Sequence, residues 1–331
     1  MRNVLYYLLI TPIKLHRKAD MNILLTGGAG FIGSHVADAL LEDGNRVAII
    51  DDLSTGRREN VPHKASFHKK SITDPDLSDV FIEEQPDVVI HHAAQISVSS
   101  SVKNPIGDME INIKGTLQLL ETAVKHGIKK FIFASTGGAI YGEHDYFPAD
   151  ENHPVRPLSP YGIAKLAVEK YLFFYYTTHG LPYTTLRYSN VYGPRQDPYG
   201  EAGVVAVFTM KMLAGADPTI NGTGEQTRDF VFVKDVAGAN LLAVRHNVVG
   251  EFNISTARET TINDVFSILQ TTTGARVSET HGPAMPGEQM RSVIAWGKAQ
   301  KQLGWSPATP LQDGLYQTVQ YFKQRGETPC P

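Results

Sequence analysis

The chain has 331 residues, of which 42% are hydrophobic and 20% charged, so it can bury an ordinary globular core and is neither disordered nor fibrous. Its formal net charge of −3 leaves no basic excess to neutralise a phosphate backbone, and this disfavours nucleic-acid binding. A single cysteine, Cys330, excludes an internal disulfide and a cysteine-based metal site, and it suits a reducing, cytoplasmic compartment.

The first twenty residues do not fit the pattern of the rest. The apolar run at 4–10 is much shorter than the roughly 20 residues that a membrane-spanning helix needs. Arg2 before this run leaves a signal peptide open, although no small-residue cleavage site precedes Met21. We expect the fold to begin at Met21 and residues 1–20 to be a weakly ordered extension or the product of an upstream start.

A strand, a glycine-rich turn, a helix and a second strand follow Met21. The apolar run at 22–25 predicts the first strand, and the β-branched run at 46–50 predicts the second. Between them, Ile32 and Val36 belong to an apolar stripe at helical spacing. This order describes a parallel βαβ unit.

The alternation of strands and helices continues to about residue 190. Further strands are predicted at 88–90, 130–134 and 183–187, with helices at 113–124 and 164–176. Such alternation predicts an α/β fold, a doubly wound parallel sheet of the Rossmann type with helices on both faces. After residue 190 glycine and proline cluster and the regularity is lost. We therefore predict a main domain at 21–190 and a smaller α/β substrate lobe at 191–331, with some segments returning to the main sheet.

The turn after the first strand is rich in glycine. Two registers fit, because Gly30 and Gly33 can pair with either Gly27 or Gly28. Glycine lets the backbone approach a pyrophosphate, which the free N–H groups of a helix N-terminus then bind. The turn lies between a predicted strand and helix, and Asp51 ends the next strand eighteen positions after Gly33. This context predicts dinucleotide binding over a merely tight turn.

The acid at the end of the second strand favours NAD over NADP. Asp51 would accept hydrogen bonds from the ribose hydroxyls of the adenosine, and its charge would repel a 2′-phosphate. Arg57 and Arg58 in the following loop could bind that phosphate instead, although a solvated turn is the simpler interpretation.

A tyrosine and a lysine four residues apart form the candidate catalytic pair. This spacing places Tyr161 and Lys165 on one helical face, where the ammonium lowers the pKa of the phenol. A bound nicotinamide cation would lower it further, so Tyr161 could act as a base near neutral pH. The pattern becomes specific here because it follows a dinucleotide turn and a strand ending in Ser135 and Thr136.

These motifs resemble the extended short-chain dehydrogenase/reductase family, and within it the nucleotide-sugar epimerases. The similarity covers residues 21 to about 322. It is carried by TGGAGFIGSH at 26–35, DDLSTG at 51–56, HHAAQ at 91–95, NIKGT at 112–116, STGGAIYG at 135–142, YGIAK at 161–165, LRYSNVYGPR at 186–195, TRDFVFVKD at 227–235, PGE at 286–288 and LGW at 303–305.

The resemblance implies a role for each matching position. Tyr161 would be the catalytic base, Lys165 its activator and Thr136 the nearest supporting hydroxyl. The NAD site would be formed by Gly27, Gly30, Phe31, Ile32, Gly33, Asp51, Asp52, Leu53, Ser54, Thr55, Gly56, Ser71, Ile72, His92, Ala93, Ala94, Gln95, Asn112, Ser135, Tyr161, Lys165, Tyr188 and Ser189. The UDP-sugar would be bound by Asn190, Val205, Thr219, Asn221, Arg228, Arg291 and Ser292.

Arg228 and the two adjacent histidines each allow a second interpretation. Arg228 would bind the diphosphate through bidentate, charge-assisted bonds, although it could instead pair with the adjacent Asp229. His91 and His92 could suggest a metal, but neighbouring strand residues point to opposite faces and no third ligand is evident, so we predict no metal site.

Three positions depart from the family pattern. Gly137 stands where Ser or Thr is usual, Ser71 where an Asp commonly contacts adenine, and Met285 where a second phosphate-binding arginine is usual. We take Thr136 and Arg291 as the substitutes for the first and third. The Thr-Asp-Glu of the family's 4,6-dehydratases is also absent at 137–139, which argues against that reaction.

The resemblance also implies the reaction and the assembly. We expect a soluble cytoplasmic homodimer, paired through helices near 108–126 and 161–177, that inverts C4 of a UDP-hexose through a 4-keto intermediate. Ser292, four places after Glu288, replaces a bulky family tyrosine, so UDP-GlcNAc and UDP-GalNAc should fit beside UDP-glucose and UDP-galactose. The alternatives are another nucleotide-sugar epimerase or a uronic-acid decarboxylase, and a non-catalytic NAD-sensing protein of the same fold. No nucleic-acid or membrane partner is expected.

Overall fold

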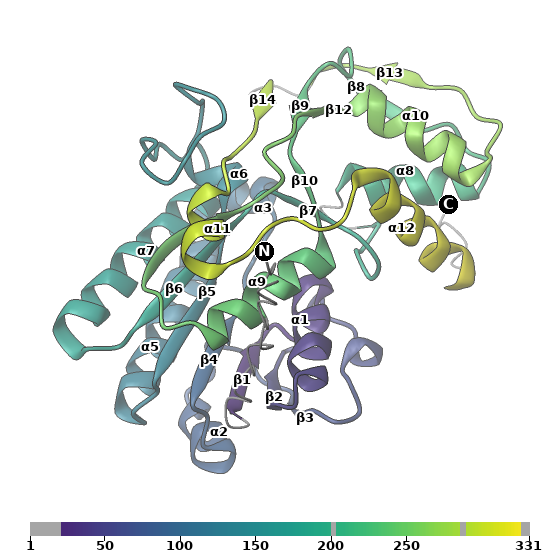
Figure 1. Cartoon of the computed structure of the whole chain (residues 1–331). Helices are drawn as coiled ribbons and strands as arrows, with labels where there is room; N and C mark the ends of the chain where they lie inside the picture. Colours follow the sequence, from purple (N-terminus) through teal and green to yellow (C-terminus); the bar gives the residue numbers. More distant parts are fainter. Residues whose placement is uncertain (1–20, 200–202, 285–288, 326–331) are drawn as a thin grey trace, which may run out of the picture.

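The computed structural model describes residues 21–199, 203–284 and 289–325. The expected extension at 1–20 lies outside the described residues, as do Met285, Glu288 and Cys330. At the centre is a sheet of seven parallel strands in the order β11-β6-β5-β4-β1-β2-β3, which confirms the predicted fold class (Figure 1).

The strand order reverses between β1 and β4, and this is where a doubly wound sheet opens a crevice at its carboxyl ends. The strands of the sheet are β1 (Asn22–Thr26), β2 (Arg46–Ile50), β3 (Ser66–His68), β4 (Val88–His91), β5 (Lys130–Thr136), β6 (Tyr183–Tyr188) and β11 (Gly250–Ile254). The last of these comes from beyond residue 190 and pairs with β6.

Helices cover both faces of the sheet. One face carries α1 (Phe31–Glu42), α9 (Val233–Arg245) and α11 (Gly297–Leu303), and the other carries α2 (Leu77–Glu84), α5 (Thr116–Lys125) and α7 (Pro160–His179). Successive β1 residues show the division, because Ile23 and Leu25 pack with the first group and Leu24 with the second. Burial on both faces explains why the strands read as continuous apolar runs.

The predicted helix at 113–124 was wrong at its start. The chain is helical from residue 98 almost without interruption, through α3 (Val98–Lys103), α4 (Pro105–Met109) and a π-helical segment, η2 (Glu110–Gly115), before α5. The π segment breaks the apolar periodicity that the prediction relied on. Similarly, α7 begins four residues before the predicted 164 because Ser159 caps it and Pro160 occupies its first turn.

A second core forms beside the carboxyl ends of the strands. It is built by α8 (Val204–Leu213), α10 (Ile262–Thr273) and α12 (Leu311–Arg325), which pack around buried aromatic side chains. The remaining elements are η1 (Arg58–Asn60), α6 (Gly137–Ile140), β7 (Asn190–Tyr192), β8 (Thr219–Asn221), β9 (Thr227–Arg228), β10 (Phe230–Phe232), β12 (Thr260–Thr261), β13 (Thr280–Gly282) and β14 (Arg291–Ser292). The domain boundary at residue 190 stays a prediction. Within the described ranges, no helix combines the length and the apolar character that crossing a membrane requires.

Candidate active site

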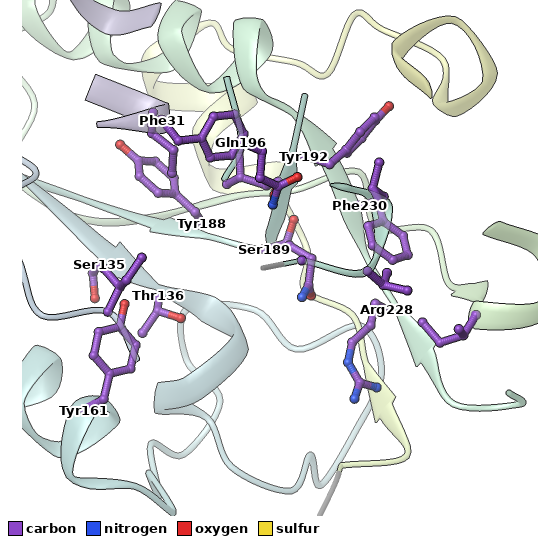
Figure 2. Close-up of a pocket in the computed structure, with 18 residues that line it drawn as sticks. Phe31, Ser135, Thr136, Tyr161, Tyr188, Ser189, Tyr192, Gln196, Arg228 and Phe230 are labelled. Atoms are coloured by element: carbon purple, nitrogen blue, oxygen red, sulfur yellow. The ribbon is translucent and has the colours of Figure 1, made fainter. Parts of the chain in front are cut away.

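A cavity of about 420 Å³ lies at the carboxyl ends of the main sheet and reaches into the smaller lobe. Most of the predicted residues in it are drawn in Figure 2. The predicted residues on its wall are Phe31, Ile32, Ser135, Thr136, Tyr161, Tyr188, Ser189, Asn190, Val205 and Arg228. The cavity therefore brings together the start of α1, which follows the glycine turn, Tyr161 on α7 and the proposed diphosphate ligands, which are far apart in the sequence.

The glycine turn is closed so tightly that side chains cannot replace its hydrogens. A Cβ on Gly33 would lie 2.2 Å from the Gly27 carbonyl oxygen, and a Cβ on Gly27 would lie 2.6 Å from the Ala93 nitrogen. Gly27 also has a φ of +71°. Gly30 caps α1, and in the described structure no side chain takes the capping position, so the N–H groups of the first turn face outward. This cradle fits the pyrophosphate of a dinucleotide.

Asp51 lies at the end of β2, beside that turn. Its carboxylate accepts hydrogen bonds from the Ala29 and Leu53 nitrogens, each at 2.9 Å, while burial raises its pKa. A Cβ on Gly56 would lie 2.6 Å from Asp51 Oδ1, so the loop at 51–56 wraps closely around the carboxylate. The position of Asp51 suits a ribose ligand.

The two arginines that could bind a 2′-phosphate have other contacts. Arg57 lies 3.6 Å from Asp197 in an ion pair, and the guanidinium of Arg58 stacks 4.5 Å from the ring centroid of Phe67. These contacts favour the simpler interpretation of a surface turn.

The segment after β4 is held by the side chain of Asn112. Its Oδ1 accepts from the Gln95 nitrogen and its Nδ2 donates to the Gln95 oxygen, both at 2.9 Å. His92 Nε2 forms a hydrogen bond of 3.0 Å with the Tyr188 hydroxyl. His91 instead forms hydrogen bonds with the hydroxyl groups of Thr26 and Thr116. The two histidines thus have partners on different sides of the strand. Ala93 and Ala94 follow in the same segment. Like Ser71 and Ile72, the residues of this segment from His92 to Gln95 and Asn112 lie outside the cavity lining.

Tyr161 and Lys165 lie in the first two turns of α7. Figure 2 shows the Tyr161 hydroxyl directed toward Ser135 and Thr136 at the end of β5. Lys165 is buried beneath, with Nζ donating to the Ala134 oxygen at 3.0 Å and lying 5.8 Å from the Tyr161 ring centroid. Burial lowers the pKa of Lys165 to about 8, although Asp108 and Glu169 oppose the shift.

The hydroxyls at the end of β5 differ in their availability. Ser135 Oγ donates to Glu169 Oε1 at 2.7 Å, whereas the Thr136 hydroxyl has no hydrogen bond within the part of the chain that the structure describes. At Gly137 a Cβ would lie 2.3 Å from Ile294 Cδ1, so this isoleucine occupies the space of the family's Ser or Thr side chain. Among the hydroxyls at the end of β5, that of Thr136 is therefore the one without a hydrogen bond in the described residues, and its support of Tyr161 stays a prediction.

A buried ion pair, which our sequence reasoning missed, supports the same strand end. Arg187 on β6 donates to both carboxylate oxygens of Glu169, at 3.0 and 2.6 Å, and its NH1 donates to the Tyr141 hydroxyl at 2.9 Å. Both charged side chains are at most 5% exposed. The position of Glu169, one turn after Lys165, was the only sequence signal for it.

The substrate residues fall into two groups. Asn190, Val205 and Arg228 line the cavity, whereas Thr219, Asn221, Arg291 and Ser292 do not. Arg228 NH1 donates to the Gln289 oxygen at 2.8 Å, while Asp229 turns away to accept from Thr256 and Ala257. The wall also includes Gln196, Tyr192 and Phe230, to which the sequence analysis assigned no role.

Arg291 and Ser292 lie beside Arg228 on the short sheet. β14 pairs with β9, and this places Ser292 opposite Arg228 in the register. Arg291 forms an ion pair with Glu259 at 2.6 Å, and its guanidinium lies 3.8 Å from the Phe147 ring centroid. Its role as a phosphate ligand stays a prediction.

Solved structures of other proteins share this architecture along nearly the whole chain. The UDP-glucose 4-epimerase of Thermotoga maritima, solved with UDP-glucose, is 50% identical with a TM-score of 0.91, covering 93% of this chain and 100% of that one. The UDP-glucose 4-epimerase of Thermus thermophilus, solved with NAD, is 43% identical with a TM-score of 0.88, covering 92% and 99%. The UDP-N-acetylglucosamine 4-epimerase of Methanobrevibacter ruminantium, solved with UDP-N-acetylmuramic acid, is 36% identical with a TM-score of 0.88, covering 92% and 99%.

A family model gives the same result from sequence. The model of the NAD dependent epimerase/dehydratase family matches residues 23–255, which span the glycine turn, Tyr161, Lys165 and Arg228. The resemblance inferred from the motifs is thereby confirmed, and the chain belongs to the NAD dependent epimerase/dehydratase family.

Proposed function

We propose that this protein inverts C4 of a UDP-hexose, interconverting UDP-glucose and UDP-galactose with NAD as a bound cofactor. The observation that carries the proposal is the convergence of Tyr161, the free hydroxyl of Thr136 and the guanidinium of Arg228 on one cavity beside the glycine turn. Membership of an NAD-dependent family and the UDP-sugar epimerases of the same fold support it.

The proposed cofactor residues form one continuous cradle. Gly27, Gly30 and Gly33 admit the pyrophosphate, and Asp51 faces the adenosine ribose. When bound, NAD would supply a hydride acceptor that returns the hydride within the same cycle. The negative charge of Asp51 and the contacts of Arg57 and Arg58 favour NAD over NADP.

Tyr161 would remove the proton from the sugar 4-hydroxyl. The Lys165 ammonium, buried beneath its ring, favours the phenolate, because an opposite charge nearby stabilises the ionised form. Thr136 would hold the 4-hydroxyl or relay its proton, since Ser135 is engaged by Glu169 and Gly137 has no side chain. The resulting 4-keto sugar would turn over in the cavity before the proton returns from Tyr161.

On the opposite side, Asn190 and Arg228 would bind the diphosphate and Val205 would contact the uridine. Thr219 and Asn221 would have to approach from the rim, because β8 lies outside the cavity lining. Ser292 is small and lies next to Arg228, so we further propose that the site accepts N-acetylhexosamines.

We propose a homodimer that pairs through α7 and the helical segment at 108–126, which includes α5. Apolar side chains that would be costly to leave in water are exposed along both. They are Met109, Ile111, Ile163, Phe173 and Phe174. Light scattering during gel filtration should give twice the 36.4 kDa chain mass, and Phe173→Glu should shift it to the monomer. Ile82→Glu, an equally exposed site on α2, should leave the dimer intact. A wild-type monomer would contradict the proposal.

Incubating the purified protein with UDP-galactose and separating the products tests the reaction. Formation of UDP-glucose without added NAD supports both the epimerase and a retained cofactor. Release of CO₂ from UDP-glucuronic acid would instead identify a decarboxylase, and NAD binding without any turnover would identify a sensor. The single cysteine, Cys330, is our basis for placing the enzyme in the cytoplasm.

A further inference from the structure

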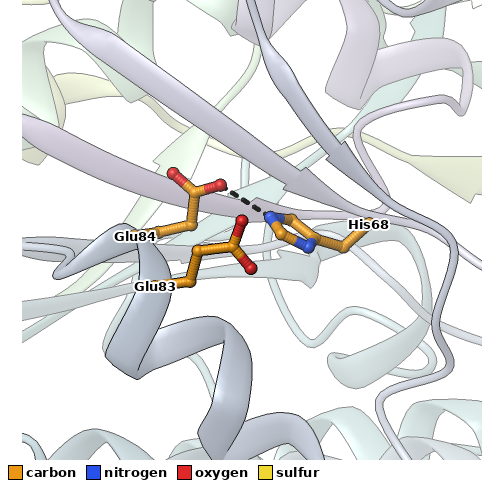
Figure 3. A group of neighbouring side chains, drawn as sticks. All are labelled: His68, Glu83 and Glu84. Atoms are coloured by element: carbon orange, nitrogen blue, oxygen red, sulfur yellow. Dashed lines mark hydrogen bonds and ion pairs between the residues drawn. The ribbon is translucent and has the colours of Figure 1, made fainter.

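Three side chains with metal-ligand chemistry meet at the edge of the main sheet, in a part of the molecule that the proposed reaction does not use. His68 ends the edge strand β3, and Glu83 and Glu84 form the last turn of α2. Figure 3 shows both carboxylates directed toward the imidazole ring. One ligand atom from each residue lies within 4.8 Å of the other two.

Within this group, two carboxylates share a single imidazole. His68 Nε2 lies 2.6 Å from Glu84 Oε1, so the imidazole forms a hydrogen bond with one of the two carboxylates. Within the described ranges, Glu83 has no hydrogen bond or ion pair. The carbonyl ends of α2 add further negative potential at the same place. A divalent cation bound with neutral imidazole would balance both carboxylates.

The site is accessible to ions from solution. His68 and Glu84 are half-buried, with side-chain exposures of 14% and 20%, while Glu83 is exposed. Both glutamates also line a second cavity of about 480 Å³, to which Arg46 and Lys64 contribute competing cationic groups. A metal could therefore enter, and water could complete its coordination.

The ligand set indicates which ions would bind. Around Zn²⁺ at about 2.0–2.1 Å, tetrahedral ligand atoms lie roughly 3.3 Å apart, so the group needs only side-chain adjustments. One imidazole nitrogen and two carboxylates suit a first-row transition metal, whereas Mg²⁺ and Ca²⁺ prefer oxygen ligands alone. We propose that His68, Glu83 and Glu84 bind one Zn²⁺-like divalent ion, which links β3 to α2.

Isothermal titration of the full chain, stripped of metal with a chelator, tests the proposal. We expect one tight Zn²⁺ equivalent, no comparable binding of Mg²⁺, and a rise in melting temperature with Zn²⁺. His68→Ala and Glu84→Gln should each weaken that binding at least about tenfold and abolish the rise. Glu83→Gln alters an exposed residue, so it tests the site without threatening the fold.

The matched control is His281→Ala. His281 lies 3.8 Å from Glu279 in an exposed pair that has no third metal-ligand side chain among the described residues, so this variant should bind Zn²⁺ as the wild type does. Equal Zn²⁺ affinity in the wild type and in all three site variants would show that the metal binds elsewhere and would overturn the proposal. Absence of Zn²⁺ binding by the wild type would overturn it as well. Either result would leave the epimerase proposal untouched, because that is measured by sugar conversion.

Discussion

The two sides of the active-site cavity are built in different ways. Tyr161 and Lys165 stand on a twenty-residue helix packed against long parallel strands, and the buried Glu169–Arg187 pair locks that helix to the sheet. The side proposed for UDP combines Val205 on α8 with strands only two or three residues long, drawn from distant segments. The first arrangement fixes reacting groups rigidly, as catalysis requires, while the second can vary with the sugar.

The catalytic side should fail most severely when its base is removed. Tyr161→Phe keeps the ring that packs above Lys165 but removes the hydroxyl. We expect turnover of UDP-galactose to fall by about 10²–10⁴-fold, because general-base catalysis contributes that much. NAD content and melting temperature should stay unchanged. Turnover near the wild-type rate would show that another group acts as the base.

Breaking the buried Glu169–Arg187 ion pair should lower the stability of the folded protein. Glu169→Gln leaves Arg187 buried without its carboxylate, and we expect a loss of about 3–5 kcal/mol in the free energy of unfolding. Denaturant titration measures it. The exposed Arg291–Glu259 pair provides the control, since Glu259→Gln should cost less than about 1 kcal/mol. Equal losses of unfolding free energy in both variants would mean that the buried Glu169–Arg187 pair stabilises the fold no more than an exposed pair does.

Removing the supporting hydroxyl should have a smaller effect. Thr136→Val keeps the shape of the side chain but cannot hydrogen-bond the sugar, so turnover should fall about tenfold, the value of one hydrogen bond. NAD affinity should not change. If this variant turns over normally, Tyr161 works without a hydroxyl partner.

On the variable side, substitution should change selectivity rather than chemistry. Ser292→Tyr adds a ring beside Arg228. We expect this variant to lower the activity toward UDP-GlcNAc by at least about tenfold, because overpacking costs about 1–3 kcal/mol. Activity toward UDP-glucose should survive. Equal loss of both activities, or no acetamido activity in the parent, would place Ser292 outside the selectivity mechanism.

The last prediction concerns the buried lysine and pH. Burial lowers the pKa of Lys165 from 10.5 to about 8, so the unfolded chain binds more protons between these values. Folding stability should therefore rise with pH from about 8 to 10.5, by up to about 1.4 kcal/mol per pH unit, and the cost of burying the charge is constant below that window. Lys165→Met should lose this rise relative to the wild type in denaturant titrations at matched pH. The same slope in both proteins would contradict the burial argument.

Most of the correct predictions came from patterns within short stretches of the sequence. The glycine turn followed by Asp51, and Tyr161 followed by Lys165, each depend on spacing within one or two elements. Local geometry sets such spacings, so they are readable without tertiary contacts. The helix start at 113 was misplaced because a π segment shifts the register there, and the apolar period cannot reveal such a shift.

The sequence by itself determined the doubly wound sheet and the dinucleotide turn, and it predicted the Tyr161–Lys165 pair, because periodicity and spacing encode these features locally. Only the tertiary structure decided which hydroxyl remains beside Tyr161. Ile294, more than 150 residues away, fills the space above Gly137, and Glu169 engages Ser135. The meeting of His68 with Glu83 and Glu84 was likewise decided by the packing of a strand end against a helix end. Contacts between segments so far apart depend on how whole elements pack, and no local pattern records that.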